Sequence, residues 1–303
     1  MIPFRKLTGK DLPEFTRYYP HCEERGCEYS FANIWIWGRQ RAAFMDGFLV
    51  LFSQFDRFSL YPFPLGDGNV KPVLDAIIHD ARARGIPCRI SSMTEADCQL
   101  LEQLYPGQFR FHTDRDSYDY VYAIEDLATL RGKRYQSKRN FVNRFWENHP
   151  NCRILPLGDD TVDAIRELAQ AWYVSKMQQD PLSDFYLEQL ALERALSNWK
   201  CLELEGLVLM EEGQPLAMTL GSRLSEISFD IHFEKALDTA PGAYAVINQA
   251  FAQYLLQKYP QLQYLNREDD MGIPGLRKAK LSYRPHHLVE KHWARLWEDD
   301  DEN

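Results

Sequence analysis

The sequence contains no long apolar run. No segment approaches the roughly 18 consecutive apolar residues that a membrane-spanning helix requires. The first residues, MIPFRK, also lack the apolar core of a secretory signal. We therefore expect a cytoplasmic protein with no integral membrane segment.

Metal-binding motifs are equally scarce. The six cysteines form no CxxC pair and the histidines form no HxxxH pair. His21, Cys22 and Cys27 supply at most half of a metal site, because a structural site needs four ligands. We expect no metal, and we expect the cysteines to be reduced, buried and hydrophobic in role.

Positive charge is in deficit, which limits the class of partner. The chain has 303 residues, a formal net charge of −9 and a pI near 5.4. This acidity argues against a protein coated by nucleic acid, although it leaves room for one local basic groove. The length predicts about two domains, each able to bury a core.

One basic segment stands out against this background. Residues 131–144, RGKRYQSKRNFVNR, contain six Lys or Arg and no acid. On a helix, Tyr135, Val142, Phe145 and Trp146 form an apolar stripe. The polar side chains then remain available for the phosphates of a cofactor or an RNA, and the candidates are Lys133, Arg134, Lys138, Arg139 and Asn140. The alternative is an ordinary amphipathic helix whose cations pair with acids elsewhere.

The rest of the chain predicts an α+β protein. Residues 42–52 read as a hairpin around Asp46-Gly47, followed by helices at 70–84 and 94–105 and by strands at 87–91, 109–112 and 118–124. Helices at 160–179 and 183–197, the latter opening on Ser183 or Asp184, precede three strands at 202–210, 215–221 and 226–234. A Pro-Gly break then leads to a helix at 243–258, a strand at 262–266, a helix at 275–282 and a last strand at 288–295.

Three polar residues alternate along one predicted strand. Asp230, His232 and Glu234 would share one face of a sheet, with Ile231 and Phe233 turned into the core. Acyl transfer to an amine needs a proton acceptor, and Glu234 is our first candidate. His232 is either the base or a hydrogen-bond bridge. The alternative is a solvated sheet face.

An acidic loop follows the strand at 262–266. Asn266 ends that strand, and Glu268, Asp269 and Asp270 come next. Acidic side chains at the carboxyl end of a strand can bind an ammonium group, so we expect Asn266, Asp269 and Asp270 to bind substrate.

Three motifs together resemble a known family. They are the segment at 131–145, IHFEKA at 231–236, and NREDDMGIPGLRKAK at 266–280 followed by Tyr283 and Pro285. As a set they look like the soluble family related to the C-terminal domain of phosphatidylglycerol lysyltransferases, which has tandem GNAT folds akin to Fem-type aminoacyltransferases. The resemblance implies mixed, mostly antiparallel sheets flanked by helices. We expect one GNAT-like domain at 1–130, a bridging helix at 131–150 and a second domain at 151–303.

The resemblance also implies roles for residues near the C-terminus. GNAT folds hold a donor pyrophosphate at a helix N-terminus, which corresponds here to Gly242, Ala243 and Tyr244. Lys280 would face donor phosphates or pair with the acidic loop. Tyr283 would be the general acid, or a packed aromatic.

Two functions follow from this reading. The first is transfer of an acyl or aminoacyl group from acyl-CoA or aminoacyl-tRNA to an amine or hydroxyl, with no permanently bound cofactor. The second is a catalytically silent protein that binds a nucleotide or RNA through the basic helix. Convergence of Asp230, Glu234 and Tyr283 on one pocket favours the first function.

Overall fold

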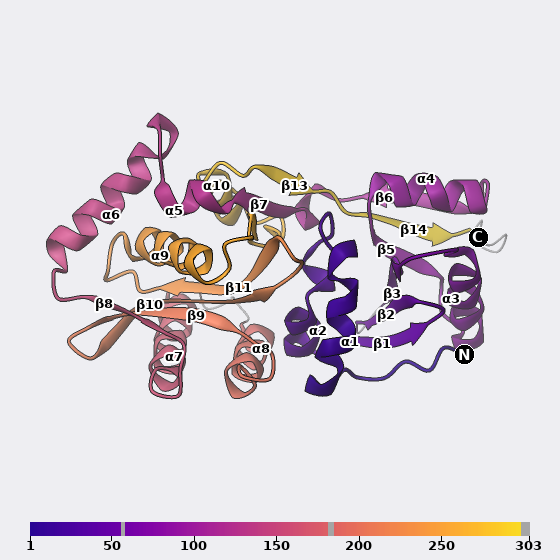
Figure 1. Cartoon of the computed structure of the whole chain (residues 1–303), viewed down its shortest axis with the longest axis horizontal. Helices are drawn as coiled ribbons and strands as arrows, with labels where there is room; N and C mark the ends of the chain where they lie inside the picture. The colour runs from indigo at the N-terminus through magenta and orange to yellow at the C-terminus, as the bar shows by residue number, and fades with distance from the viewer. Residues whose placement is uncertain (56–57, 181–184, 298–303) are drawn as a thin grey trace. The chain divides into compact units, whose positions relative to one another are not determined.

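The computed structural model describes residues 1–55, 58–180 and 185–297 (Figure 1). Its contacts divide the chain into two compact units, each built on its own sheet. Unit 1 comprises residues 1–119, 269–274 and 288–303, and unit 2 comprises residues 120–268 and 275–287.

Unit 1 is a mixed sheet in the order β1-β2-β3-β5-β14-β6, with β4 paired to β2. Its strands are β1 (Gln40–Met45), β2 (Phe48–Gln54), β3 (Ser59–Pro62), β4 (Leu65–Gly66), β5 (Arg89–Met93), β6 (Phe109–Thr113) and β14 (His292–Leu296). Its helices are α1 (Leu12–Phe15), α2 (Phe31–Trp37), α3 (Lys71–Arg84) and α4 (Glu95–Leu104). The buried faces of α3 and α4 share one apolar core with the sheet.

The predicted hairpin of unit 1 is confirmed. Met45 pairs with Phe48, and the two turn residues Asp46 and Gly47 have φ values of 51° and 80°. Two consecutive positive φ angles define the turn whose twist matches antiparallel strands, and Asp-Gly favours it.

Unit 2 is a second mixed sheet in the order β13-β7-β12-β11-β10-β9-β8. Its strands are β7 (Asp119–Ala123), β8 (Arg153–Pro156), β9 (Glu205–Glu211), β10 (Gln214–Arg223), β11 (Ser228–Ala236), β12 (Tyr264–Asn266) and β13 (His287–Val289). Its helices are α5 (Ile124–Thr129), α6 (Gln136–Asn148), α7 (Val162–Gln179), α8 (Tyr186–Ser197), α9 (Ala243–Lys258) and α10 (Pro274–Leu281). Strands β11 and β12 run parallel, whereas the pairs β12–β7, β11–β10, β10–β9 and β9–β8 are antiparallel.

Helices cover both faces of the second sheet. Figure 1 shows α9 on one face and α7 and α8 on the other. The side chains agree with this arrangement. Phe229 of β11 packs on Phe251 of α9, with ring centroids 5.9 Å apart, while Lys235 of the same strand pairs with Glu188 of α8.

Several sequence expectations need correction. The basic helix is α6 and lies within unit 2, and residues 288–303 belong to unit 1, so the predicted boundaries at 130 and 150 do not match the two units. The strand predicted at 288–295 is split between β13 and β14. Cys201 is exposed, whereas the other five cysteines are buried. The predicted helix start at Ser183 or Asp184 lies outside the described residues.

Helix α6 carries the apolar stripe that the sequence predicted. Tyr135, Val142 and Phe145 are buried, and Trp146 is half-buried. The helix packs against α9, and the contact is close at Gly242, which precedes α9 with φ +95°. A Cβ atom at Gly242 would lie 2.8 Å from the carbonyl oxygen of Phe141. The approach of α6 is therefore sufficient by itself to require glycine here.

Replacement of Gly242 tests this packing. Gly242→Ala would add a steric conflict with α6 to the strain of a positive φ. Gly213→Ala is the control, because Gly213 has φ +83° and none of the described residues comes within 4 Å of an added Cβ. In urea unfolding we expect Gly242→Ala to lower the free energy of unfolding by roughly 1–3 kcal/mol more than Gly213→Ala does. Equal losses of unfolding free energy in the two variants would mean that α6 moves away from the added methyl group without a loss of stability.

Candidate active site

The candidate site of unit 2 lies where two parallel strands separate. Strands β11 and β12 pair from Ser228 opposite Tyr264 to Asp230 opposite Asn266. Beyond that point β11 continues to Ala236 along β10, whereas the chain leaves β12 at Arg267. The carboxyl ends of parallel strands are common positions for ligand sites, because side chains there are not covered by a neighbouring strand.

A β-bulge changes the expected pattern of side chains on β11. Ile231 pairs with Gly221 and Phe233 with Leu220, so His232 is an extra residue in the ladder. An extra residue reverses the alternation of faces beyond it. The prediction that Asp230, His232 and Glu234 share one face is therefore wrong.

Glu234 lies on the face covered by α9, in a network with Arg267. One carboxylate oxygen accepts a hydrogen bond from Arg267 Nη2 at 2.7 Å, and the other accepts from Asn248 Nδ2 of α9 at 3.2 Å. Only 8% of the Glu234 side chain and 15% of the Arg267 side chain are exposed. Both oxygens of this carboxylate are therefore engaged in hydrogen bonds, one of them to a guanidinium.

Tyr283 and Lys138 complete the cluster. The Arg267 guanidinium lies 5.0 Å from the ring centroid of Tyr283, and Lys138 Nζ lies 3.7 Å from the same centroid. Lys138 Nζ also donates a hydrogen bond to Ser282 Oγ at 2.7 Å. Four segments thus meet here: α6 through Lys138, β11 through Glu234, the segment after β12 through Arg267, and the segment after α10 through Tyr283.

The environment of the cluster shifts its protonation. Burial, together with the charge of Arg267, lowers the pKa of Lys138 to about 8, although Glu234 acts in the opposite direction. Burial raises the pKa of the Tyr283 phenol, which therefore stays protonated at neutral pH. Burial has the largest effect on Arg267 and disfavours its charge, but Glu234 and the surrounding tyrosines together outweigh burial, so the Arg267 pKa is raised. The cluster thus combines the cation of Arg267, an amine whose pKa is about 8, and a protonated phenol.

Asp230 and His232 belong to a separate group with Ser222 and Glu268. His232 Nε2 lies 2.9 Å from Ser222 Oγ, and its Nδ1 lies 3.4 Å from an Asp230 oxygen and 3.6 Å from a Glu268 oxygen. The order of these groups resembles a serine–histidine–aspartate relay. However, the His232 and Asp230 side chains are 1% and 0% exposed, so no substrate reaches them in this conformation.

The residues predicted to hold a donor cofactor have other partners. Gly242 is packed by α6, and Ala243 is fully buried. The Tyr244 hydroxyl accepts a hydrogen bond from Trp172 Nε1 at 3.1 Å. Lys280 Nζ donates hydrogen bonds to the carbonyl oxygens of Arg267 and Glu268, at 2.5 and 3.1 Å, so it fixes the loop after β12.

The predicted acidic loop does not present a row of free carboxylates. The Asn266 side chain accepts from the backbone of Glu268 at 2.7 Å. In unit 1, Asp270 is fully buried, accepts from Gly272 N at 2.9 Å and lies 3.7 Å from Arg115 Nη1. Asp269 is half-buried. The prediction that Asp270 binds an ammonium group is wrong, because its carboxylate is used inside the loop.

Apart from Lys138, the cations of the basic segment divide into two groups. Arg134 pairs with Asp126 at 2.5 Å, and Arg139 donates to the carbonyl oxygens of Leu130 and Gly132. These contacts support the alternative in which such cations have structural partners. Among the residues that the structure describes, Arg131, Lys133 and Arg144 have no ion pair and are exposed, as is Asn140.

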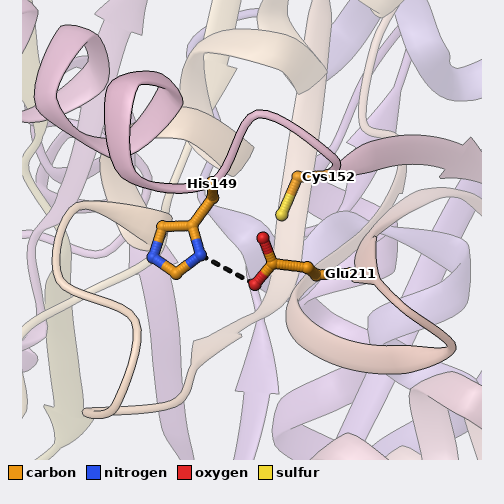
Figure 2. Close-up of side chains that lie close together, drawn as sticks. All are labelled: His149, Cys152 and Glu211. Carbon is orange, nitrogen blue, oxygen red and sulfur yellow. Dashed lines mark hydrogen bonds and ion pairs between the residues drawn. The ribbon is translucent and has the colours of Figure 1, made fainter.

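The sequence offers His21, Cys22 and Cys27 as at most part of a metal site. Unit 2 contains another cluster of side chains that can ligate metals. Figure 2 shows His149 Nδ1 paired with Glu211 at 2.8 Å, and the sulfur of Cys152 directed toward the same carboxylate. Burial raises the pKa of the Cys152 thiol to about 11. The pair joins the end of α6 to the end of β9, and the ligand atoms of His149, Cys152 and Glu211 all lie within 4.8 Å of one another.

Two residues of the cluster were not assigned to it from the sequence. The sequence predicts no role for Arg267, which adjoins the acidic loop, and predicts that Lys138 binds phosphates of a cofactor or an RNA. The available signal was positional, since Arg267 is the cation that directly follows a strand ending inside a sheet.

Comparison with known proteins is consistent with this fold. A conserved protein of unknown function from Bacteroides thetaiotaomicron has a TM-score of 0.92 at 36% identity, covering 98% of this chain and all of that one. L-PGS from Bacillus licheniformis has a TM-score of 0.69 at 16% identity, covering 98% and 94%. A tandem GNAT protein from the clavulanic acid biosynthesis pathway has a TM-score of 0.51 at 8% identity, covering 99% and 100%. These likenesses confirm the predicted α+β tandem GNAT-like fold.

A curated relative matches over a shorter range. An uncharacterised protein of Mycoplasmoides gallisepticum is 25% identical over 191 residues, which is 59% of this chain and 56% of that protein. The match therefore spans about half the length of the relative. Within the described part of this chain, every helix is too short or too polar to cross a membrane.

The family model for the C-terminal region of phosphatidylglycerol lysyltransferase matches residues 20–295. This range includes all three motifs that carried the resemblance. The chain belongs to the phosphatidylglycerol lysyltransferase C-terminal family.

Proposed function

We propose that this protein is an aminoacyl- or acyltransferase whose transfer site is the cluster of Lys138, Glu234, Arg267 and Tyr283. Family and fold point to transfer chemistry of this kind. The observation that carries the proposal is Lys138, a largely desolvated amine with a pKa of about 8 beside a buried cation and a protonated phenol. A proton acceptor works best when its pKa is close to the working pH.

Each group of the cluster has a part in the transfer step. The acceptor nitrogen or oxygen attacks the donor carbonyl carbon and gives its proton to the neutral Lys138 amine. Arg267 Nη1 is buried and has no hydrogen-bond partner among the described residues, so once the side chains that cover it move aside it can hold the carbonyl oxygen as negative charge develops. The bond to the leaving group then breaks, and Tyr283 supplies the proton that the leaving group takes. Lys138 returns its proton to Tyr283, and Glu234 orients Arg267 throughout.

Aminoacyl-tRNA is the donor that we favour over acyl-CoA. Helix α6 fills the space beside Gly242, close to the helix N-terminus where a GNAT enzyme holds a pyrophosphate. The exposed cations Arg131, Lys133 and Arg144 suit an RNA backbone. The family description concerns lysyl transfer, which agrees with an aminoacyl donor, and such a donor implies a cytoplasmic protein. The acceptor carries an amine or a hydroxyl.

The silent alternative has one observation in its favour. Glu234 and Tyr283 meet around Arg267, but Asp230 lies on the other face of the sheet, so the three predicted groups do not all converge. A protein that only binds RNA would use the exposed cations and leave the cluster as a structural network.

The pH dependence of turnover tests Lys138. Because the base must be neutral, the rate of aminoacyl-tRNA deacylation by a hydroxylamine acceptor should rise with pH through about 8 and level off above it. Lys138→Arg stays charged, so it should remove this rise and reduce turnover by roughly 10²–10⁴-fold. Lys278→Arg, at an exposed position of α10, is the control. A second measurement is competitive labelling of Lys138, which gives the pKa of its amine from the pH dependence of its reactivity. A pKa equal to that of an ordinary lysine would contradict the proposal.

Glu234 and Asp230 give a comparison between the two faces of the sheet. Glu234→Gln keeps the shape but weakens the hold on Arg267, so turnover should fall by roughly 10²–10⁴-fold with donor binding largely kept. Asp230→Asn should change turnover by only a few-fold once the folded fraction is equalised by circular dichroism. Similar losses in both variants would show that the reaction does not depend on the face with Arg267.

The salt dependence of tRNA binding tests the exposed cations. Lys133→Gln with Arg144→Gln should lower the log–log salt slope by roughly 0.7–0.9 for each phosphate that is no longer neutralised, almost independently of nucleotide sequence. The control carries the same charge change at exposed positions of unit 1, Lys10→Gln with Arg17→Gln. If both pairs of changes act alike, net charge alone explains binding, and the donor is then an acyl thioester.

A further inference from the structure

Unit 1 contains a cavity that the proposed reaction does not use. Its volume is about 760 Å³, within the range of roughly 300–1,000 Å³ typical of small-molecule sites. Aromatic side chains form much of its wall, namely Trp37, Phe55, Phe58 and Trp293. Such a wall suits an apolar or aromatic body, while the polar residues of the lining set which charged groups can enter.

The first polar feature of the wall is Glu28, which belongs to a buried charge cluster. Lys291 Nζ lies 2.9 Å from one Glu28 oxygen and 2.6 Å from Asp119 Oδ1. Asp119 Oδ2 accepts from Cys27 N at 2.7 Å, so this carboxylate is satisfied. One ammonium faces two carboxylates, and the second Glu28 oxygen is buried with no hydrogen-bond partner in the part of the chain that the structure describes. The cluster therefore has an acceptor oxygen without a partner, which lies against Gly26 and becomes available to a ligand when the Glu28 side chain turns toward the cavity. Burial raises the pKa of Glu28, so an added positive charge beside it would stabilise its carboxylate form.

Gly26 keeps this arrangement in place. A Cβ atom there would lie 2.2 Å from Glu28 Oε2 and 2.5 Å from Lys291 Cε. Gly26 itself has φ −78°, which any residue adopts. The glycine is thus required by the close approach of the two charged side chains, and any larger residue would displace them.

The second polar feature is the cation Arg39. Its guanidinium lies 5.2 Å from the ring centroid of Phe55, and both residues line the cavity. Within the described part of the chain Arg39 forms no ion pair. The neighbouring Gln40 donates to the Glu28 carbonyl at 3.5 Å, which brings the segment of Arg39 next to that of Glu28. A guanidinium that lies in an aromatic wall and forms no ion pair with the described residues is suited to bind a carboxylate.

We propose that this cavity binds a zwitterion with an apolar body, of the amino-acid or short-peptide class. Its ammonium group would bind Glu28, its carboxylate would bind Arg39, and its side chains would pack on the aromatic wall. A ligand with only an amine would leave Arg39 unpaired, and a ligand with only an acid would leave the Glu28 oxygen unpaired. In either case the ligand would cover a polar group without giving it a hydrogen bond, and the desolvation cost of that group would weaken binding. The site is independent of the transfer cluster in unit 2.

A set of matched ligands tests both charges on the full chain. The probes are L-phenylalanine, L-phenylalanyl-L-phenylalanine, its N-acetyl derivative and its C-terminal amide, compared by thermal shift and calorimetry. We expect the dipeptide or the amino acid to bind, and each blocked derivative to bind at least tenfold more weakly. Comparing the affinities of the amino acid and the dipeptide shows whether the site binds a free amino acid or a short peptide.

Variants assign each charge to its residue. Glu28→Gln can still accept from Lys291, so the fold should persist, but this variant should no longer distinguish the free dipeptide from its N-acetyl form. Arg39→Gln should no longer distinguish the dipeptide from its amide. Glu24→Gln, an exposed carboxylate outside the lining, is the control and should bind like the parent.

Three outcomes would overturn the proposal. Equal affinity for the zwitterion and a blocked form would show that the site does not bind the ligand charge that the blocking group removes. Full ligand discrimination in both variants would place the binding elsewhere. No binding of any probe by a folded protein would remove the amino-acid and peptide class.

Discussion

The ion pair between Glu234 and Arg267 is the interaction on which the site of unit 2 depends. Both side chains are largely buried, and leaving one of them unpaired in such a place costs about 3–5 kcal/mol. The pair exists because β11 and β12 separate after Asp230 and Asn266, which leaves room for side chains between the strands. If the two strands stayed paired, Arg267 could form an ion pair only with a carboxylate at the surface.

The bulge at His232 decides which residues can take part. It divides the polar residues of β11, so that Glu234 faces α9 whereas Asp230 and His232 face the interior on the other side. The two groups have opposite properties. The first combines charges with a buried donor on Arg267 that none of the described residues engages, and the second is closed from solvent and hydrogen-bonded to Ser222. A single inserted residue thus separates a reactive environment from a structural one.

Patterns local in sequence predicted the elements well, and contacts distant in sequence were predicted poorly. The Asp46-Gly47 turn and the apolar stripe of α6 depend on spacing and turn chemistry, so both were predicted. A bulge is a property of two paired strands, and alternation along one strand cannot reveal it. Similarly, Asp270 looked like an exposed loop acid, but its partners Gly272 and Arg115 include a residue far away in the sequence.

One carboxylate also links the charges of the cluster to the basicity of Lys138. Burial lowers the pKa of that lysine most, Arg267 lowers it further and Glu234 raises it, and together they leave the value at about 8. Removal of Glu234 would expose Lys138 to an uncompensated cation and would lower its pKa further. The amine would then be neutral over a wider pH range but a weaker base. Glu234 therefore affects the reaction through Arg267 and Lys138, even though both of its own oxygens are already engaged.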